Sequence, residues 1–281
     1  MIKNIISVLV NLTFYPLFFL SCMLKKNKNI WIFSSWQGSR FTDNPKAFHE
    51  YVITNSTDCG NLRTIWIVKD RLIINDFPNL ETYYAYSFWG IYYQCKAGVV
   101  IYTDSVAEGF FEHCICPWTF QVQTWHGFPL KKIRNDVYVR KSGVFKFILE
   151  FFLPFRYDNP DVIVHTTKKS SSLIANAFGV TESKVYSIGY PRNDTLMAPS
   201  DYFLELPINF LYAPTYRNRG LDGHMSYEFL QKLGELLGEH GATLDLKLHP
   251  ADIGRIDPTL LPAEVTILKQ KADLTKILRN Y

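Results

Sequence analysis

Short apolar runs alternate with helical stretches along most of the chain. From residue 29 onward, stretches of helical character separate apolar runs at 30–34, 63–68, 98–102, 120–124 and 161–166. Strands that are apolar throughout are typical of a parallel sheet covered by helices on both faces. The pattern therefore predicts an α/β fold with a doubly wound sheet, whose ligands bind at the carboxyl ends of the strands.

The chain has 281 residues, which is enough for two modest α/β domains, each with its own core. Residues 197–208 carry two prolines and mixed polarity, so we expect a linker there. Three further apolar runs follow, at 209–214, 243–248 and 265–268. Two helical stretches accompany them, at 227–239 and 274–280. We therefore expect an N-terminal domain over residues 29–196 and a smaller C-terminal domain over residues 209–281.

Composition and motifs exclude several classes of protein. A hydrophobic content of 47% with 20% charged residues indicates a globular chain, and a net charge of +4 gives no reason to expect nucleic acid as a partner. Five irregularly spaced cysteines do not suggest a disulfide framework. Cys114 and Cys116 beside His113 lack a fourth ligand at zinc spacing, so we expect no metal. The chain also lacks the P-loop, dinucleotide-binding, zinc-peptidase and nucleophile-elbow motifs.

His126 is the candidate catalytic residue. It lies in W-H-G-F-P-L-K-K, directly after the predicted strand at 120–124 and therefore at a carboxyl end of the sheet. An imidazole titrates near neutral pH and suits a general base. Trp125 is expected to wall a pocket, and Gly127 to let another group approach the backbone. Lys131 and Lys132 bring positive charge for an anionic partner. The alternative is a histidine that only satisfies a strand-to-loop turn.

A second set of polar residues follows strands of the C-terminal domain. Thr215 and Arg217 come after the run at 209–214, and His249 comes after the run at 243–248. A hydroxyl and a guanidinium in such places suit phosphate oxygens. His249 either donates to phosphate or braces the following turn. Arg192 is a further candidate phosphate ligand, with an interdomain ion pair as its alternative.

Two segments suggest contact with a membrane. Residues 5–24 are almost continuously apolar and are followed by Lys25, Lys26 and Lys28. Such a segment either spans a bilayer or lies in its interface, and the basic flank keeps the rest of the chain on the cytoplasmic face. Residues 143–155 are rich in phenylalanine and flanked by cations, which suits an anionic lipid surface. We therefore expect residues 1–28 to be membrane-associated, and the alternative for each segment is a helix packed in the protein core.

Four motifs together resemble one known family. They are W-H-G-F-P-L-K-K at 125–132, G-Y-P-R-N-D at 189–194, L-Y-A-P-T-Y-R at 211–217 and K-L-H-P at 247–250. In this order and spacing they resemble the CDP-glycerol glycerophosphotransferases, the primases and polymerases of teichoic acid. The family also carries a D-Y-S-S motif, expected shortly after a segment like 272–281, where this sequence stops. The expected C-terminal domain is therefore incomplete.

The resemblance implies a GT-B-like pair of Rossmann-type domains and a transfer of glycerol phosphate. The donor, CDP-glycerol, is expected mainly on the C-terminal domain, with Thr215, Arg217 and His249 holding its pyrophosphate. The acceptor is expected to be a lipid-linked or polymeric polyol phosphate whose hydroxyl attacks phosphorus. His126 takes the proton, CMP leaves, and no cofactor is implied.

Two other functions remain open at this point. One is a GT-B glycosyltransferase that uses a nucleotide sugar, and the other is an inactive, membrane-bound remnant. The choice between a glycerol and a ribitol donor also stays open, as do the identity of the acceptor and the choice between primase and polymerase.

Overall fold

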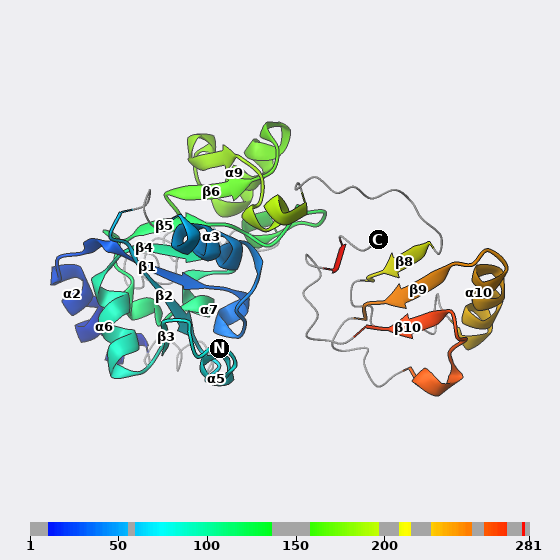
Figure 1. Ribbon diagram of the computed structural model, residues 1–281. Coiled ribbons are helices and arrows are strands. Elements are labelled where there is room, and N and C mark those ends of the chain that lie inside the picture. The colour runs from blue at the N-terminus through cyan, green and yellow to red at the C-terminus, as the bar shows by residue number, and fades with distance from the viewer. Residues whose placement is uncertain are drawn as a thin grey trace. The chain divides into compact units, whose positions relative to one another are not determined.

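The computed structural model describes residues 11–55, 60–136, 158–196, 208–214, 226–248, 256–268 and 277–278. The chain divides into two compact units, Met1–Arg192 and Asn193–Tyr281 (Figure 1). Residues 143–155 and nearly all of the expected linker, 197–207, lie outside the described residues.

Within its described residues, the first unit is built on a seven-stranded, wholly parallel sheet. Its strand order is β3-β2-β1-β4-β5-β6-β7, so the order reverses between β1 and β4. This confirms the doubly wound sheet. The strands are β1 (Asn27–Ser34), β2 (Arg63–Val68), β3 (Thr82–Tyr84), β4 (Ala97–Tyr102), β5 (Phe120–Gln123), β6 (Val162–His165) and β7 (Val185–Ser187).

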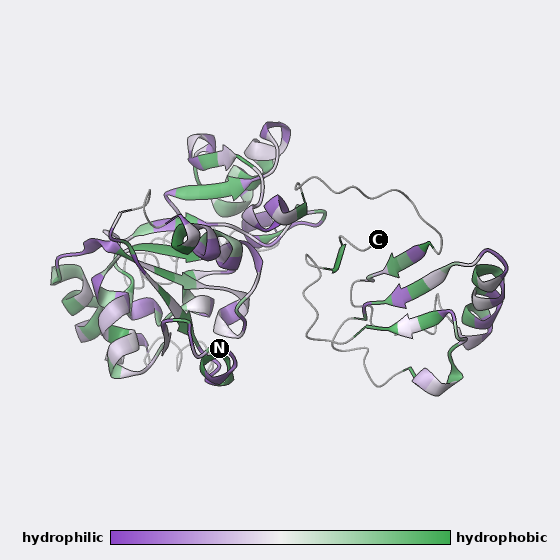
Figure 2. Ribbon diagram, viewed as in Figure 1, coloured by the Kyte–Doolittle hydropathy of each residue, from purple (hydrophilic) through white to green (hydrophobic). Residues whose placement is uncertain are grey.

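Two cores lie on the two faces of this sheet, because successive side chains of a strand point to opposite sides. On β1, Ile32 belongs to a cluster with Tyr93 of the helix at 88–96, whereas Phe33 belongs to a cluster with Phe48 of the helix at 43–54 and Ile73 of the helix at 72–76. The strands accordingly appear largely hydrophobic in Figure 2. The α-helices in the part of this unit that the structure describes are α2 (Tyr15–Met23), α3 (Asp43–Thr54), α5 (Leu72–Asp76), α6 (Phe88–Lys96), α7 (Val106–Gly109) and α9 (Ser171–Phe178).

Helix α2 packs onto the first unit. Phe18 is buried against Cys116, and the Ser21 hydroxyl donates to the carbonyl of Cys114 at 2.6 Å. The Lys26 ammonium then donates to the Ser21 hydroxyl at 3.1 Å. None of the helices within the described residues is long and apolar enough to cross a membrane.

The second unit has a three-stranded parallel sheet among its described residues, in the order β10-β9-β8. The strands are β8 (Asn209–Tyr212), β9 (Thr243–Leu246) and β10 (Val265–Ile267). Helix α10 (Tyr227–Glu239) begins at Ser226, whose hydroxyl accepts from the Phe229 amide. It buries Leu230 and Leu237 against the sheet and turns a polar side outward (Figure 2). Most of the helix expected at 274–280 lies outside the described residues.

Candidate active site at the carboxyl edge of the sheet

The candidate site lies where the strands of the first sheet end, which we call the carboxyl edge. Strand β5 ends at Gln123, and Trp125, His126 and Gly127 follow at once. The loop after β1 and the start of α3 lie at the same edge, beside the point where the strand order reverses. Ligands of doubly wound sheets bind at this place.

The turn that carries His126 is held by Asn44. Trp125 has φ +50°, a left-handed conformation that costs a bulky residue about 1–2 kcal/mol. Asn44 offsets this strain, because its buried side-chain amide donates to the carbonyls of Thr124 at 3.2 Å and Trp125 at 2.8 Å. On the other side, the Trp125 amide donates to the Gln123 side chain at 2.8 Å. The turn is therefore fixed before any ligand arrives.

The His126 ring is exposed and supported on one face. The Trp125 indole stacks on it with ring centroids 4.1 Å apart and planes inclined by 30°. Trp125 itself packs against Phe178 in a T-shaped arrangement, with ring centroids 5.3 Å apart. An imidazole held this way is oriented by an aromatic wall and remains open to a reactant on its other side.

Tyr190 and Arg192 hold the turn from the loop after β7. The Tyr190 hydroxyl donates to the Gly127 carbonyl at 2.8 Å. Burial raises the pKa of Tyr190 to about 12, so this donor keeps its proton at neutral pH. A Cβ on Gly127 would lie 3.8 Å from Nη2 of Arg192, which places a guanidinium beside the histidine turn.

Arg192 forms an ion pair within the first unit. Its Nη1 lies 2.8 Å from Oδ1 of Asp43, and the Asp43 side chain is only 2% exposed. The Arg192 amide also donates to the Asn44 side-chain oxygen at 3.3 Å. One partner of Arg192 thus comes from α3, within the first unit.

His165 is a residue of this edge that the sequence analysis missed. It ends β6, it is fully buried, and its Nε2 lies 2.6 Å from the Ser170 hydroxyl. Phe128, two residues after His126, stacks on the His165 ring with ring centroids 5.6 Å apart. Burial lowers the pKa of His165, which favours the neutral ring. Its place at the end of an apolar strand was the available signal. No local signal in the sequence marked Asp43 and Asn44, the first two residues of α3.

The remaining predicted residues divide into two groups. Lys131 and Lys132 are exposed on the loop that follows the histidine turn. Thr215, Arg217 and His249 lie outside the described residues, so the structure gives no geometry for the predicted donor-phosphate site.

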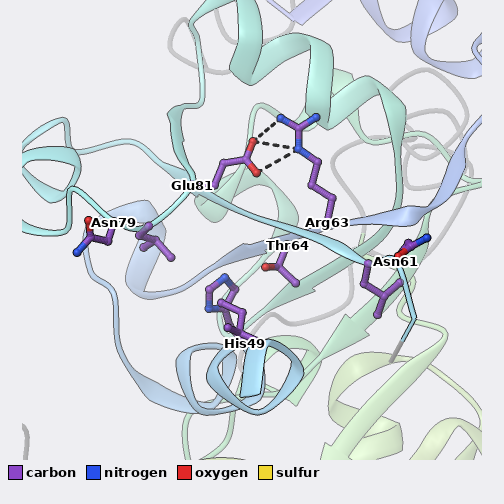
Figure 3. Close-up of a pocket in the computed structure, with 9 residues that line it drawn as sticks. His49, Asn61, Arg63, Thr64, Asn79 and Glu81 are labelled. Atoms are coloured by element: carbon purple, nitrogen blue, oxygen red, sulfur yellow. Dashed lines mark hydrogen bonds and ion pairs between the residues drawn. The ribbon is translucent and has the colours of Figure 1, made fainter. Parts of the chain in front are cut away.

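A separate cavity of about 480 Å³ lies at the opposite edge of the first sheet. It is lined by residues at the amino ends of β2 and β3, among them Thr64 and the Arg63–Glu81 ion pair, and by His49 of α3 (Figure 3). Because all strands are parallel and His126 follows a carboxyl end, this cavity is not part of the site described above.

The doubly wound sheet, with the histidine turn at its carboxyl edge, and the second α/β unit are typical of a GT-B-like fold. A family model described as CDP-Glycerol:Poly(glycerophosphate) glycerophosphotransferase matches residues 16–279. The chain belongs to this family.

Curated relatives agree with this assignment. The chain is 29% identical to a teichoic acid glycerol-phosphate transferase of Staphylococcus aureus over 92% of its own length and 69% of that protein. It is 28% identical to a teichoic acid poly(glycerol phosphate) polymerase of Bacillus spizizenii, of which it spans 55%. The solved structure of the wall teichoic acid polymerase TagF aligns over 99% of this chain and 72% of that one, with 19% identity and a TM-score of 0.67, which supports the shared fold.

Proposed function

We propose that this chain transfers glycerol phosphate from CDP-glycerol to a hydroxyl of a teichoic-acid-type acceptor and releases CMP. Membership in the glycerophosphotransferase family supports the reaction class. The observation that carries the assignment to particular residues is the exposed His126 on a turn held by Asn44.

In this mechanism, His126 is the general base. The acceptor oxygen attacks the phosphorus that bears glycerol, His126 takes the hydroxyl proton, and the bond from phosphorus to the bridging oxygen breaks as CMP leaves. Proton transfer by a positioned imidazole contributes about 10²–10⁴-fold in rate. Two contacts support this role: the Trp125 indole orients the His126 ring, and the Tyr190 bond to the Gly127 carbonyl fixes the backbone of the turn.

The negative charge of the donor needs cations and hydroxyls. Thr215, Arg217 and His249, by their places after predicted strands, bind the pyrophosphate and stabilise the charge that grows on CMP. Arg192 adds a guanidinium beside Gly127. An arginine has five N–H donors, so it is able to contact phosphate while it keeps its bond to Asp43. Lys131 and Lys132 attract the anionic acceptor.

The chain works at the cytoplasmic face of the cell membrane in this proposal. Phe19 and Met23 of α2 are 59% and 84% exposed, and Phe88 and Trp89 of α6 are 76% and 52% exposed. The two helices contact each other. Lys25 and Lys28 are exposed immediately after α2. Apolar and aromatic groups flanked by lysines suit an interface with anionic lipid.

A donor panel tests the proposed reaction. The purified chain is given a short glycerol-phosphate oligomer as acceptor, with CDP-glycerol, CDP-ribitol or UDP-glucose as donor, and nucleotide release is measured with and without the oligomer. We expect release of CMP from CDP-glycerol that depends on the oligomer. Faster turnover of UDP-glucose would favour a nucleotide-sugar glycosyltransferase instead, and no turnover of any donor would favour an inactive chain.

A further inference from the structure

We propose that the loop between β1 and α3 forms a subsite for a phosphate-bearing polyol, with Trp36 and Arg40 as its contact residues. The proposal rests on the proposed function, because a polyol phosphate is the repeating unit of the acceptor named there. It assigns a role to residues 35–40, which carry none of the motifs that mark the family resemblance.

The loop has an unusual backbone that its surroundings hold in place. Trp36, Gln37 and Gly38 have φ values of +47°, +58° and +73°, three consecutive residues in the left-handed region. The Trp36 amide donates to the Thr103 hydroxyl at 3.2 Å, and the Gln37 amide donates to the Asp104 carboxylate at 3.0 Å. Strained backbone of this kind is typical of ligand-binding loops, in which it presents a side chain in one fixed place.

The side chain presented here is the indole of Trp36. It is 45% exposed, and its Nε1 donates to Oδ2 of Asp43 at 3.1 Å. The indole therefore has a fixed orientation although it faces solvent. A large aromatic ring held in this manner at the carboxyl edge is a suitable surface for the carbon backbone of a polyol.

Arg40 supplies the charge. Its guanidinium lies over the Trp36 ring, 4.9 Å from the centroid, and its side chain is exposed. The buried Ser35 hydroxyl donates to the Arg40 carbonyl at 2.8 Å and fixes the backbone. A guanidinium that rests on an aromatic ring keeps its N–H groups for a phosphate, which it binds through two parallel hydrogen bonds. Arg40 also occupies a face of the indole on which a nucleotide base would stack, so the arrangement favours a polyol phosphate over a nucleotide.

Asp43 connects this subsite to the histidine turn. One of its carboxylate oxygens accepts from Trp36, and the other pairs with Arg192 at 2.8 Å. Arg192 in turn lies beside Gly127, the residue after His126. The subsite and the proposed base thus share one network at the same edge of the sheet.

Binding of the full chain to a synthetic glycerol-phosphate trimer, measured by calorimetry, tests the proposal. Glycerol, inorganic phosphate and CMP are titrated in parallel. We expect Arg40→Gln to weaken trimer binding at least about tenfold, since a hydrogen bond between charged groups is lost. Trp36→Phe keeps a ring but removes the bond to Asp43, and we expect a loss of about threefold or more.

Arg71→Gln is the matched control, because the exposed Arg71 guanidinium also lies over an aromatic ring, that of Tyr84, at 4.3 Å. It should leave binding within about twofold of the unchanged chain. The subsite is wrong if Arg40→Gln binds the trimer as the unchanged chain does, if Arg71→Gln loses as much, or if the unchanged chain does not bind the trimer. It is also wrong if Arg40→Gln weakens the binding of CMP as much as that of the trimer.

Kinetics separate this proposal from the function on which it rests. Arg40→Gln should raise the KM for the trimer as acceptor and keep kcat, whereas His126→Ala should lower kcat. An unchanged KM in Arg40→Gln together with an inactive His126→Ala would overturn the subsite and leave the proposed function standing.

Discussion

The side-chain amide of Asn44 donates to the carbonyl oxygen of Trp125 at 2.8 Å, across a sequence separation of 81 residues. Through this bond the first residues of α3 hold the strained turn on which His126 is presented. The oxygen of the same amide accepts from the Arg192 backbone, so one buried side chain ties three segments of the carboxyl edge together.

Replacing Asn44 should therefore affect both stability and catalysis. Asn44→Ala leaves the carbonyls of Thr124 and Trp125 without this donor, and we expect a loss of about 2–4 kcal/mol in the free energy of unfolding, measured in urea. We also expect kcat to fall at least about tenfold at unchanged KM for donor and acceptor, since the ring of His126 loses its orientation.

Asn55→Ala is the control for this change. Its amide donates to the Tyr51 carbonyl at 2.9 Å at the other end of α3, in an exposed position. Equal kinetics for Asn44→Ala and Asn55→Ala would show that Asn44 has only a structural role.

Two roles of Arg192 can be separated: the ion pair with Asp43 and the proposed contact with the donor phosphate. Arg192→Gln leaves the nearly buried carboxylate of Asp43 without its cation, and we expect a cost of about 3–5 kcal/mol in the free energy of unfolding. Adding Asp43→Asn removes the charge and should recover most of that loss. If Arg192 also contacts the donor phosphate, the double variant keeps a KM for CDP-glycerol about tenfold higher than that of the unchanged chain. A normal KM in the double variant would limit Arg192 to bracing Asp43.

His49 should make stability depend on pH. Burial lowers its pKa to about 4, and neither ring nitrogen has a hydrogen-bond partner among the described residues. The unfolded chain takes up a proton as the pH falls below about 6.5, whereas the folded chain does so only near pH 4. As the pH falls from 6.5 to 4, the free energy of unfolding should therefore decrease, and His49 should contribute about 2–3 kcal/mol to this decrease.

Urea unfolding at pH 7, 5 and 4 measures this slope. His49→Phe keeps a ring among Phe33, Phe41 and Trp66, and we expect it to flatten the curve. The exposed His240 is the control, and His240→Gln should leave the slope as it is. A slope that His49→Phe does not change would contradict the account of this residue.

The proposed membrane-binding surface of the protein is tested most directly on the exposed side of α2. Phe19→Ser with Met23→Ser should weaken sedimentation with vesicles that contain anionic lipid, while Phe18 and its core contact stay intact. Binding that remains should decrease with salt, because the nearby lysines are screened. Leu72→Ser, at a position 67% exposed on α5, is the control. Unchanged sedimentation of the double variant would exclude this surface of α2.

Much of the fold was predictable because the strands are buried on both faces and therefore apolar along their length. The predicted strand 63–68 is β2 (Arg63–Val68), and the predicted helix 227–239 is α10 (Tyr227–Glu239). The apolar run at 5–24 was less informative. A bilayer and a protein core select the same residues, and the contacts of Phe18 and Ser21 with Cys116 and Cys114 are not readable from composition.

The candidate site was predictable only in part, for a related reason. His126 stands in a short motif at the end of a strand and is visible in the sequence. Asp43 and Asn44 act on residues far along the chain, and nothing local marks a helix start that will clamp a distant turn. Similarly, the pairing of Arg192 depends on which segment folds beside it. Such roles follow from tertiary contacts and appear only with the structure.

The central claim is that His126 is the base of the transfer. The direct measurement is the rate of acceptor-dependent CMP release from CDP-glycerol by His126→Ala, together with calorimetric binding of CDP-glycerol to the same variant. The account predicts a rate lower by about 10²–10⁴-fold with donor affinity within about twofold of the unchanged chain. A rate within about threefold of the unchanged chain would contradict it, because a base that contributes to the transition state cannot be removed at so small a cost.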